Sequence, residues 1–123
     1  MKRPSDKEII KRIREAQEAV AKGRLAILNQ EVMAADALEL AYLVKGELES
    51  VLSELLDLIS PAHYVGTRPP QRSYEQAIKD LELFAFEVIS PRFKSPIYFK
   101  FASSIGILWL VSLHKSRGRQ EVV

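Results

Sequence analysis

The hydrophobic pattern of this chain changes its period at Pro61, and that change limits the folds the chain can adopt. Before Pro61, apolar residues recur every three to four positions, the spacing of amphipathic helices. After Pro61, they gather in short runs rich in aromatic and β-branched side chains, which are typical of strands. Helices followed by strands predict an α+β domain, in which the helices cover one face of an antiparallel sheet.

Three helices are predicted in the first half. The segment Ser5-Asp6-Lys7-Glu8 has the form of a capping box, and Gly23 stands where the first helix would end in a left-handed residue. A second helix is predicted over about 30–40, with Asn29 as its N-cap. A third is predicted over about 46–59. We expect the apolar stripes of these helices to form the core.

Three strands are predicted in the second half, over residues 81–89, 96–102 and 107–114. The breaks between them are too short for a parallel connection, which needs a dozen or more residues. We therefore expect an antiparallel meander. The whole chain of 123 residues suits one domain. Its predicted parts are a helical segment (5–61), a connector (62–80), the sheet (81–117) and a tail (118–123).

Composition excludes some kinds of site. The chain has no cysteine, so it has neither disulfides nor thiolate metal ligands. With His63 and His114 as its only histidines, we predict no metal and no cofactor. The start of the chain lacks the apolar run of a signal peptide, and the longest apolar run (107–111) is too short to span a bilayer. A cytoplasmic protein is expected.

Positive charge gathers in the last third of the chain. Residues 88–123 hold six basic side chains against Glu121 alone; the six are Arg92, Lys94, Lys100, Lys115, Arg117 and Arg119. Such a distribution favours a polyanionic partner such as RNA. A solvated basic tail is the alternative interpretation.

Strand alternation divides the side chains of the last two predicted strands between two faces. Tyr98 and Lys100 share one face of their strand, and Leu110, Ser112 and His114 share one face of the next. We expect the apolar residues of these strands to face the helices; they are Phe99, Phe101, Trp109, Val111 and Leu113. The pairing register decides whether Tyr98 and His114 share a face, because a slip of one residue moves a side chain to the other face.

A tyrosine, a histidine and several cations on an open sheet face suit RNA cleavage without a metal ion. A base takes the proton of the 2′-hydroxyl group, that oxygen attacks the phosphate, and an acid protonates the leaving 5′-oxygen. His114 could be base or acid, because histidine ordinarily titrates near pH 6.5. Tyr98 would orient the phosphate or stack on a base, and Lys100, Lys115 and Arg117 would hold phosphate. Ordinary half-exposed strand residues are the alternative.

Two further clusters are candidates. Glu82 or Glu87, in the first predicted strand, could act as the general base, or both could be solvated charges. His63-Tyr64 precedes a loop that contains Arg68 and Arg72. This second cluster either lines the same groove or packs against the end of the third helix.

The order of these features resembles MqsR-type toxins over roughly residues 13–117. In the first half, the likeness lies in a helix that ends at Ala21-Lys22-Gly23, a second that ends at Ala37-Leu38-Glu39-Leu40, and an aromatic residue after the third, at Ala62-His63-Tyr64. In the second half, Ile97-Tyr98-Phe99-Lys100-Phe101 resembles the family's (V/I)Y(L/V)K strand. The run Leu110-Val111-Ser112-Leu113-His114-Lys115 resembles its closing VSFK or SFH strand.

The resemblance implies a RelE-like sheet, sequence-preferring cleavage of mRNA, and an antitoxin protein that holds the enzyme inactive. By position, Tyr98 corresponds to the family's active-site tyrosine. His114, or the neighbouring Lys115, takes the place of its lysine on the last strand.

Two positions depart from the family pattern. Val65-Gly66 stands where the family has a lysine, and residues 83–86 contain no glutamine. The site would then use Lys100, Arg92 or Arg68 for these tasks, or would not cleave RNA.

Three interpretations therefore remain open. The chain is a toxin ribonuclease with a cognate antitoxin, or a non-catalytic RNA- or protein-binding module on the same fold, or an interaction protein that makes its contacts through the helical half. Trp109 lies either in the core or in a dimer contact, so the sequence also leaves a homodimer open.

Overall fold

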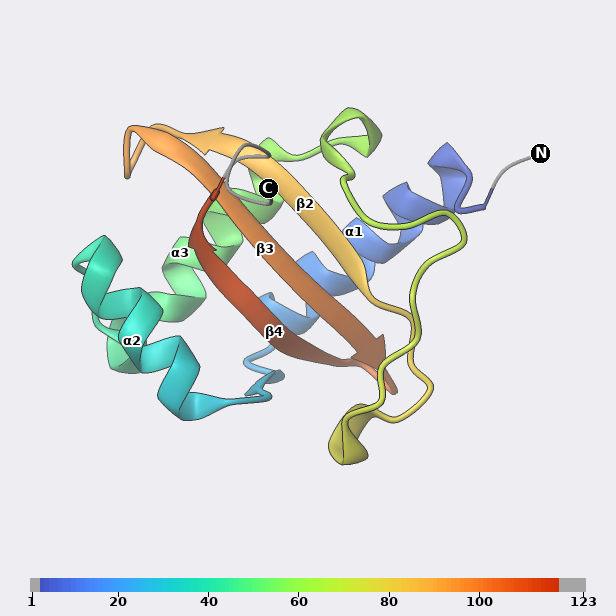
Figure 1. The fold of residues 1–123 in the computed structure, drawn as a ribbon, viewed down its shortest axis with the longest axis horizontal. Helices are drawn as coiled ribbons and strands as arrows, with labels where there is room; N and C mark the ends of the chain where they lie inside the picture. Colours follow the sequence, from blue (N-terminus) through green and yellow to red (C-terminus); the bar gives the residue numbers. More distant parts are fainter. Residues whose placement is uncertain (1–2, 118–123) are drawn as a thin grey trace.

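Residues 3–117 of the computed structural model form three α-helices and one four-stranded mixed sheet (Figure 1). The predicted tail at 118–123 lies outside these described residues. In chain order the elements are α1 (Asp6–Ala21), β1 (Leu25–Ile27), α2 (Gln30–Leu40), α3 (Val44–Leu58), the short 3-10 turns η1 (Pro61–His63) and η2 (Gln76–Ile78), β2 (Phe84–Ser90), β3 (Ser95–Ser104) and β4 (Ile107–Lys115).

The first helix begins and ends where local signals place it. The Ser5 hydroxyl oxygen accepts a hydrogen bond from the Glu8 amide at 3.2 Å. The Glu8 carboxylate turns to Arg3 at 2.7 Å, which shows that only the serine half of the predicted capping box forms. Gly23, at φ +70°, follows the end of the helix in the left-handed conformation that glycine adopts at low cost.

The other two helices also follow their predicted bounds. The Asn29 side chain caps α2 by accepting from the Val32 amide at 3.1 Å. Lys45 and Gly46 are non-helical at the start of α3, so its regular part begins after Gly46, as the sequence predicts.

The predicted meander is confirmed, but the sheet has one more strand. Antiparallel pairs join β2 to β3 and β3 to β4, and β1 pairs in parallel with β4, giving the order β1-β4-β3-β2. The expectation of about three antiparallel strands is corrected accordingly. With three residues between two helices, Leu25–Ile27 carries no period of its own, and only its pairing with residues 108–110 makes it a strand.

The core lies between the sheet and the helices. Figure 1 shows α1 and α3 behind the sheet and α2 beside β4. Four phenylalanines of β2 and β3 project into this layer and are at most 1% exposed: Phe84, Phe86, Phe99 and Phe101. Phe86 and Phe101 stack with ring centroids 5.8 Å apart. The helices thus cover one face of the sheet, as expected.

A bulge in β4 corrects the predicted division of side chains. Lys100 pairs with Ser112 and Phe101 pairs with Leu110, so Val111 is an extra residue in β4. One extra residue inverts the alternation, and Leu110 therefore faces the helices with no exposed surface. The prediction that Trp109 and Val111 join this core was wrong, whereas Leu113 does face it.

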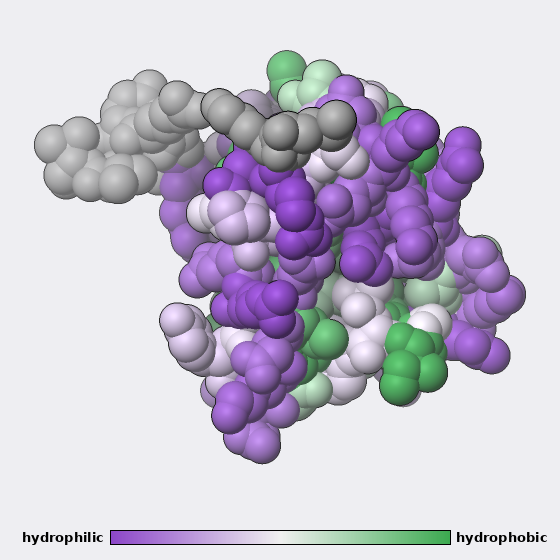
Figure 2. Space-filling view, turned by 90° about the vertical axis from the view of Figure 1, so that its right-hand side faces the viewer, coloured by the Kyte–Doolittle hydropathy of each residue, from purple (hydrophilic) through white to green (hydrophobic). Residues whose placement is uncertain are grey.

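Trp109 and Val111 belong to a small second cluster on the other face of the sheet. There they pack against buried Ala102, against Ile78 of the connector and against Leu83, which directly precedes β2. The connector thus covers the end of this face near the β3–β4 turn. The molecular surface on the connector side is largely hydrophilic, with only separate apolar patches (Figure 2).

None of the helices in the described part of the chain combines the length and apolar character needed to cross a membrane.

Candidate active site

Three polar side chains form one row across the sheet. Glu87 on β2 pairs directly with Tyr98 on β3, and Tyr98 pairs directly with His114 on β4. Directly paired residues share a face, and this is the face opposite to the helices. The register therefore decides the question that the sequence left open: Tyr98 and His114 lie side by side. We call Glu87, Tyr98 and His114 the polar row.

The rings of Tyr98 and His114 stack. Their centroids are 5.2 Å apart and their planes differ by 23°. The Nδ1 atom of His114 lies 2.7 Å from the carbonyl oxygen of Lys115. Because a carbonyl oxygen only accepts, Nδ1 carries a hydrogen and donates it, which leaves Nε2 as the nitrogen that can exchange a proton with a ligand.

Tyr98 is half-buried between its two neighbours in the polar row. Burial raises the pKa of its phenol above the ordinary value. The hydroxyl group therefore stays protonated at neutral pH, and it can donate a hydrogen bond to a phosphate oxygen.

Glu87 is an exposed carboxylate on the edge strand of the sheet. Its Oε1 atom accepts a hydrogen bond from the Ser116 hydroxyl group. Within residues 3–117, no cationic side chain forms an ion pair with Glu87. The exposed carboxylate can therefore accept a hydrogen bond from a ligand hydroxyl group, as it does from Ser116.

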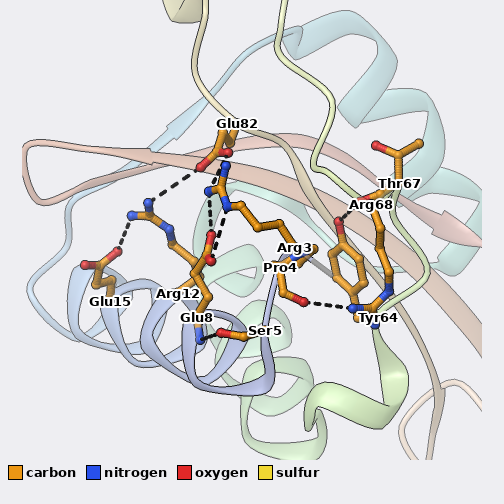
Figure 3. A network of polar contacts seen from close by, with 10 residues as sticks. All are labelled: Arg3, Pro4, Ser5, Glu8, Arg12, Glu15, Tyr64, Thr67, Arg68 and Glu82. Carbon is orange, nitrogen blue, oxygen red and sulfur yellow. Dashed lines mark hydrogen bonds and ion pairs between the residues drawn. The ribbon is translucent and has the colours of Figure 1, made fainter. Parts of the chain in front are cut away.

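Glu82, the other acidic candidate, is placed differently. Its carboxylate lies 3.1 Å from Arg3 and 3.8 Å from Arg12, on the side of α1 (Figure 3). Two guanidinium groups therefore hold this carboxylate on the side of α1, away from the polar row. Of the two carboxylates that the sequence offered, the geometry selects Glu87.

Three of the cations predicted at the site lie on or just after the strands that carry Tyr98 and His114. Lys100 lies in the next row of the same face, paired with Ala85 and Ser112. Lys115 pairs with buried Ile97, so alternation directs its side chain to the helical side rather than into the polar row. Arg117 is exposed beyond the end of β4.

Two arginines predicted to bind RNA are engaged within the protein. Arg92 donates from Nε to Glu54 of α3 at 2.9 Å, on the helical side. Arg68 donates to the carbonyl oxygen of Pro4 at 2.8 Å and lies over the Tyr64 ring at 5.1 Å (Figure 3). Neither guanidinium group joins the polar row.

Comparison with known proteins assigns no family. No protein-family model matches the chain, and no curated protein matches its sequence. The likeness to MqsR-type toxins therefore rests on sequence pattern alone.

Ser116 is the site residue that sequence reasoning missed. It lies two positions after His114, and that spacing could have placed it on the same face. Its backbone amide donates to the carbonyl oxygen of Pro96 at 2.9 Å, which holds it beside the start of β3.

Over residues 3–117, no three His, Asp or Glu side chains come together as metal ligands would.

Proposed function

We propose that this chain is a metal-independent endoribonuclease that cleaves single-stranded mRNA at the open face of its sheet. The observation that carries the proposal is the polar row, in which a carboxylate and an imidazole flank a phenol. Cleavage through the 2′-hydroxyl group requires one group that accepts a proton and one that donates a proton. Glu87 and His114 have the chemistry to form that pair.

The spacing of the row suits a phosphate. Neighbouring strands lie about 4.8 Å apart, so the backbones that carry Glu87 and His114 are about 10 Å apart. Two hydrogen bonds of about 2.7 Å each leave room between them for one phosphate group above Tyr98.

The surroundings of the row favour an anionic transition state. Lys100 lies one row away on the same face, and the Tyr98 hydroxyl group stays protonated. Both can stabilise the charge that develops on the phosphate oxygens during attack. The stacked rings of Tyr98 and His114 also offer an aromatic surface to an unpaired base.

The toxin part of the proposal draws on the sequence resemblance. Its two best segments, 97–101 and 110–115, form the neighbouring strands β3 and β4, as a shared RelE-like site requires. Where the family has a glutamine on its first strand, Glu87 on β2 would supply the polar group. We propose that the enzyme acts on mRNA in the cytoplasm and that a cognate antitoxin protein neutralises it.

One observation favours a second candidate function. Arg68 and Arg92 are bound within the protein, and of the two lysines placed in β3 and β4 only Lys100 lies on the face of the polar row. Fewer cations mean weaker stabilisation of the transition state. A non-catalytic RNA-binding module on the same face is therefore the alternative.

The direct test is cleavage of a long single-stranded RNA by purified protein in the presence of EDTA. The wild type should produce discrete cuts, and Glu87→Gln, His114→Ala and Tyr98→Phe should each lose them. Glu39→Gln, on the exposed side of α2, is the matched control and should cut normally. RNA binding without cutting by the wild type would favour the binding module instead.

A further inference from the structure

We infer that Glu87 is the general base and His114 the general acid, so that the RNA crosses the polar row from β2 to β4 in the 5′-to-3′ direction. This inference rests on the proposed ribonuclease function, and it adds the role of each residue and the direction of the strand.

The first observation is the alcohol bound to Glu87. The hydroxyl group of Ser116 donates to Oε1 of Glu87 on the open face. A general base must make the same contact with the 2′-hydroxyl group of its substrate before it removes the proton. Ser116 therefore marks the position of the attacking 2′-oxygen, and the substrate would displace the serine hydroxyl group from the carboxylate.

The second observation is the partner of His114. The Lys115 carbonyl oxygen, 2.7 Å from Nδ1, accepts a hydrogen bond from that atom. This hydrogen bond fixes Nδ1 as a donor and leaves Nε2 as the nitrogen that can pass a proton to a ligand. In its protonated form the ring presents Nε2–H to the leaving oxygen, as a general acid must.

The third observation is the order of the groups. Glu87 and His114 lie on opposite sides of Tyr98, on the two strands that flank β3. In-line displacement places the attacking and the leaving oxygen on opposite sides of phosphorus. A phosphate above Tyr98 would therefore point its attacking oxygen toward β2 and its leaving oxygen toward β4.

The chemical step then balances within the site. Glu87 takes the proton of the 2′-hydroxyl group while the 2′-oxygen forms a bond to phosphorus. The bond between phosphorus and the 5′-oxygen breaks, and Nε2 of His114 protonates that oxygen. The products are a 2′,3′-cyclic phosphate over β2 and a 5′-hydroxyl end over β4. Lys100 and the Tyr98 hydroxyl group stabilise the two non-bridging oxygens.

The test uses two RNA oligonucleotides with one cleavable linkage, whose leaving atom is either the natural 5′-oxygen or a 5′-sulfur. A thiolate leaves without being protonated, so sulfur removes the need for the acid but not for the base. On the oxygen substrate, His114→Ala and Glu87→Gln should each lose about 10²–10⁴-fold in rate. On the sulfur substrate, His114→Ala should recover most of this loss, and Glu87→Gln should recover none.

Each other outcome has one meaning. Recovery of Glu87→Gln instead would overturn the assignment by reversing both roles and the strand direction. Recovery of both variants, or of neither, would overturn it as well. A wild type that cuts neither substrate would overturn the proposed function itself. His114→Gln repeats the test with a larger side chain, and Glu39→Gln is the control. Thermal unfolding of each variant checks that it is folded.

Discussion

Tyr98 and His114 stack across β3 and β4 as a directly paired couple, with ring centroids 5.2 Å apart. Cross-strand pairs of rings stabilise a sheet through their faces, whereas the Tyr98 hydroxyl group contributes nothing to stacking. Mutation can therefore separate the stacking of the Tyr98 ring from the hydrogen bond that its hydroxyl group would donate to the phosphate.

Tyr98→Phe keeps the ring and removes the proton donor. We expect this variant to unfold at the wild-type temperature and to lose cleavage. Tyr98→Ala should lose both stability and cleavage. Differential scanning calorimetry and a gel assay with EDTA measure the two effects. Full cleavage by Tyr98→Phe would show that the hydroxyl group does not touch the phosphate.

Lys100 should contact one phosphate of bound RNA. Lys100→Gln is then expected to weaken RNA binding and to reduce the slope of log K against log salt by about 0.7, the value for one phosphate contact with a single strand. Fluorescence anisotropy over a KCl series, in the non-cleaving His114→Ala background, measures the slope. Lys11→Gln on α1, on the far side of the sheet, should leave the slope unchanged.

Arg92 should act on stability rather than on RNA. Its hydrogen bonds lower the pKa of Glu54 below the ordinary 4.5. A carboxylate whose pKa is lowered on folding stabilises the folded state at any pH above its pKa in the unfolded chain. This stabilisation is lost as the pH falls through its pKa in the folded protein. Arg92→Gln should therefore cost roughly 0.2–1 kcal/mol at pH 7, the range for an exposed pair.

Urea unfolding of wild type and Arg92→Gln at pH 7 and at a pH well below 4.5 checks this linkage. The difference between the two proteins should shrink at the lower pH. RNA affinity should stay at the wild-type value. A loss of RNA affinity with unchanged stability would return Arg92 to the RNA-binding surface.

Leu110 should be a core residue, although strand alternation in the sequence grouped it with Ser112 and His114. Because it has no exposed surface, Leu110→Ala is expected to lower the free energy of unfolding by about 2–5 kcal/mol. Leu38→Ala is the matched control, since Leu38 is 81% exposed and should change stability by no more than about 0.5 kcal/mol. Equal effects in urea unfolding would contradict the placement of Leu110.

Deletion of Val111 tests the bulge itself. Without the extra residue, Leu110 and Ser112 become consecutive, so they still point to opposite faces of the sheet. Leu110 remains paired with Phe101, and Ser112 remains paired with Lys100. The deletion variant should therefore fold cooperatively and keep the near-ultraviolet circular dichroism of Trp109. Deletion of Leu113 should instead prevent folding, because it shifts the end of β4 by one residue without removing the bulge. Failure of both variants to fold would contradict this interpretation.

Much of this fold follows from local signals in the sequence. Caps at Ser5 and Asn29, and the terminating Gly23, define the ends of helices through contacts within a few residues. The short breaks after Ser90 and Ser104 make β2, β3 and β4 an antiparallel meander, because the chain has no room for another connection. The sequence also supplied Tyr98, Lys100 and His114 as candidate site residues by simple alternation.

What the tertiary structure decided depends on distant partners. β1 becomes a strand only through its pairing with β4, and the bulge at Val111 is set by which side chains of two strands fit one core. Glu82 forms an ion pair with Arg3, and Arg92 forms one with Glu54, so neither of these two candidates belongs to the site. Hydrophobic period and capping are properties of neighbouring residues, so the sequence determines them directly. Register, faces and charge partners are properties of segments far apart in the chain, and only their packing together fixes them.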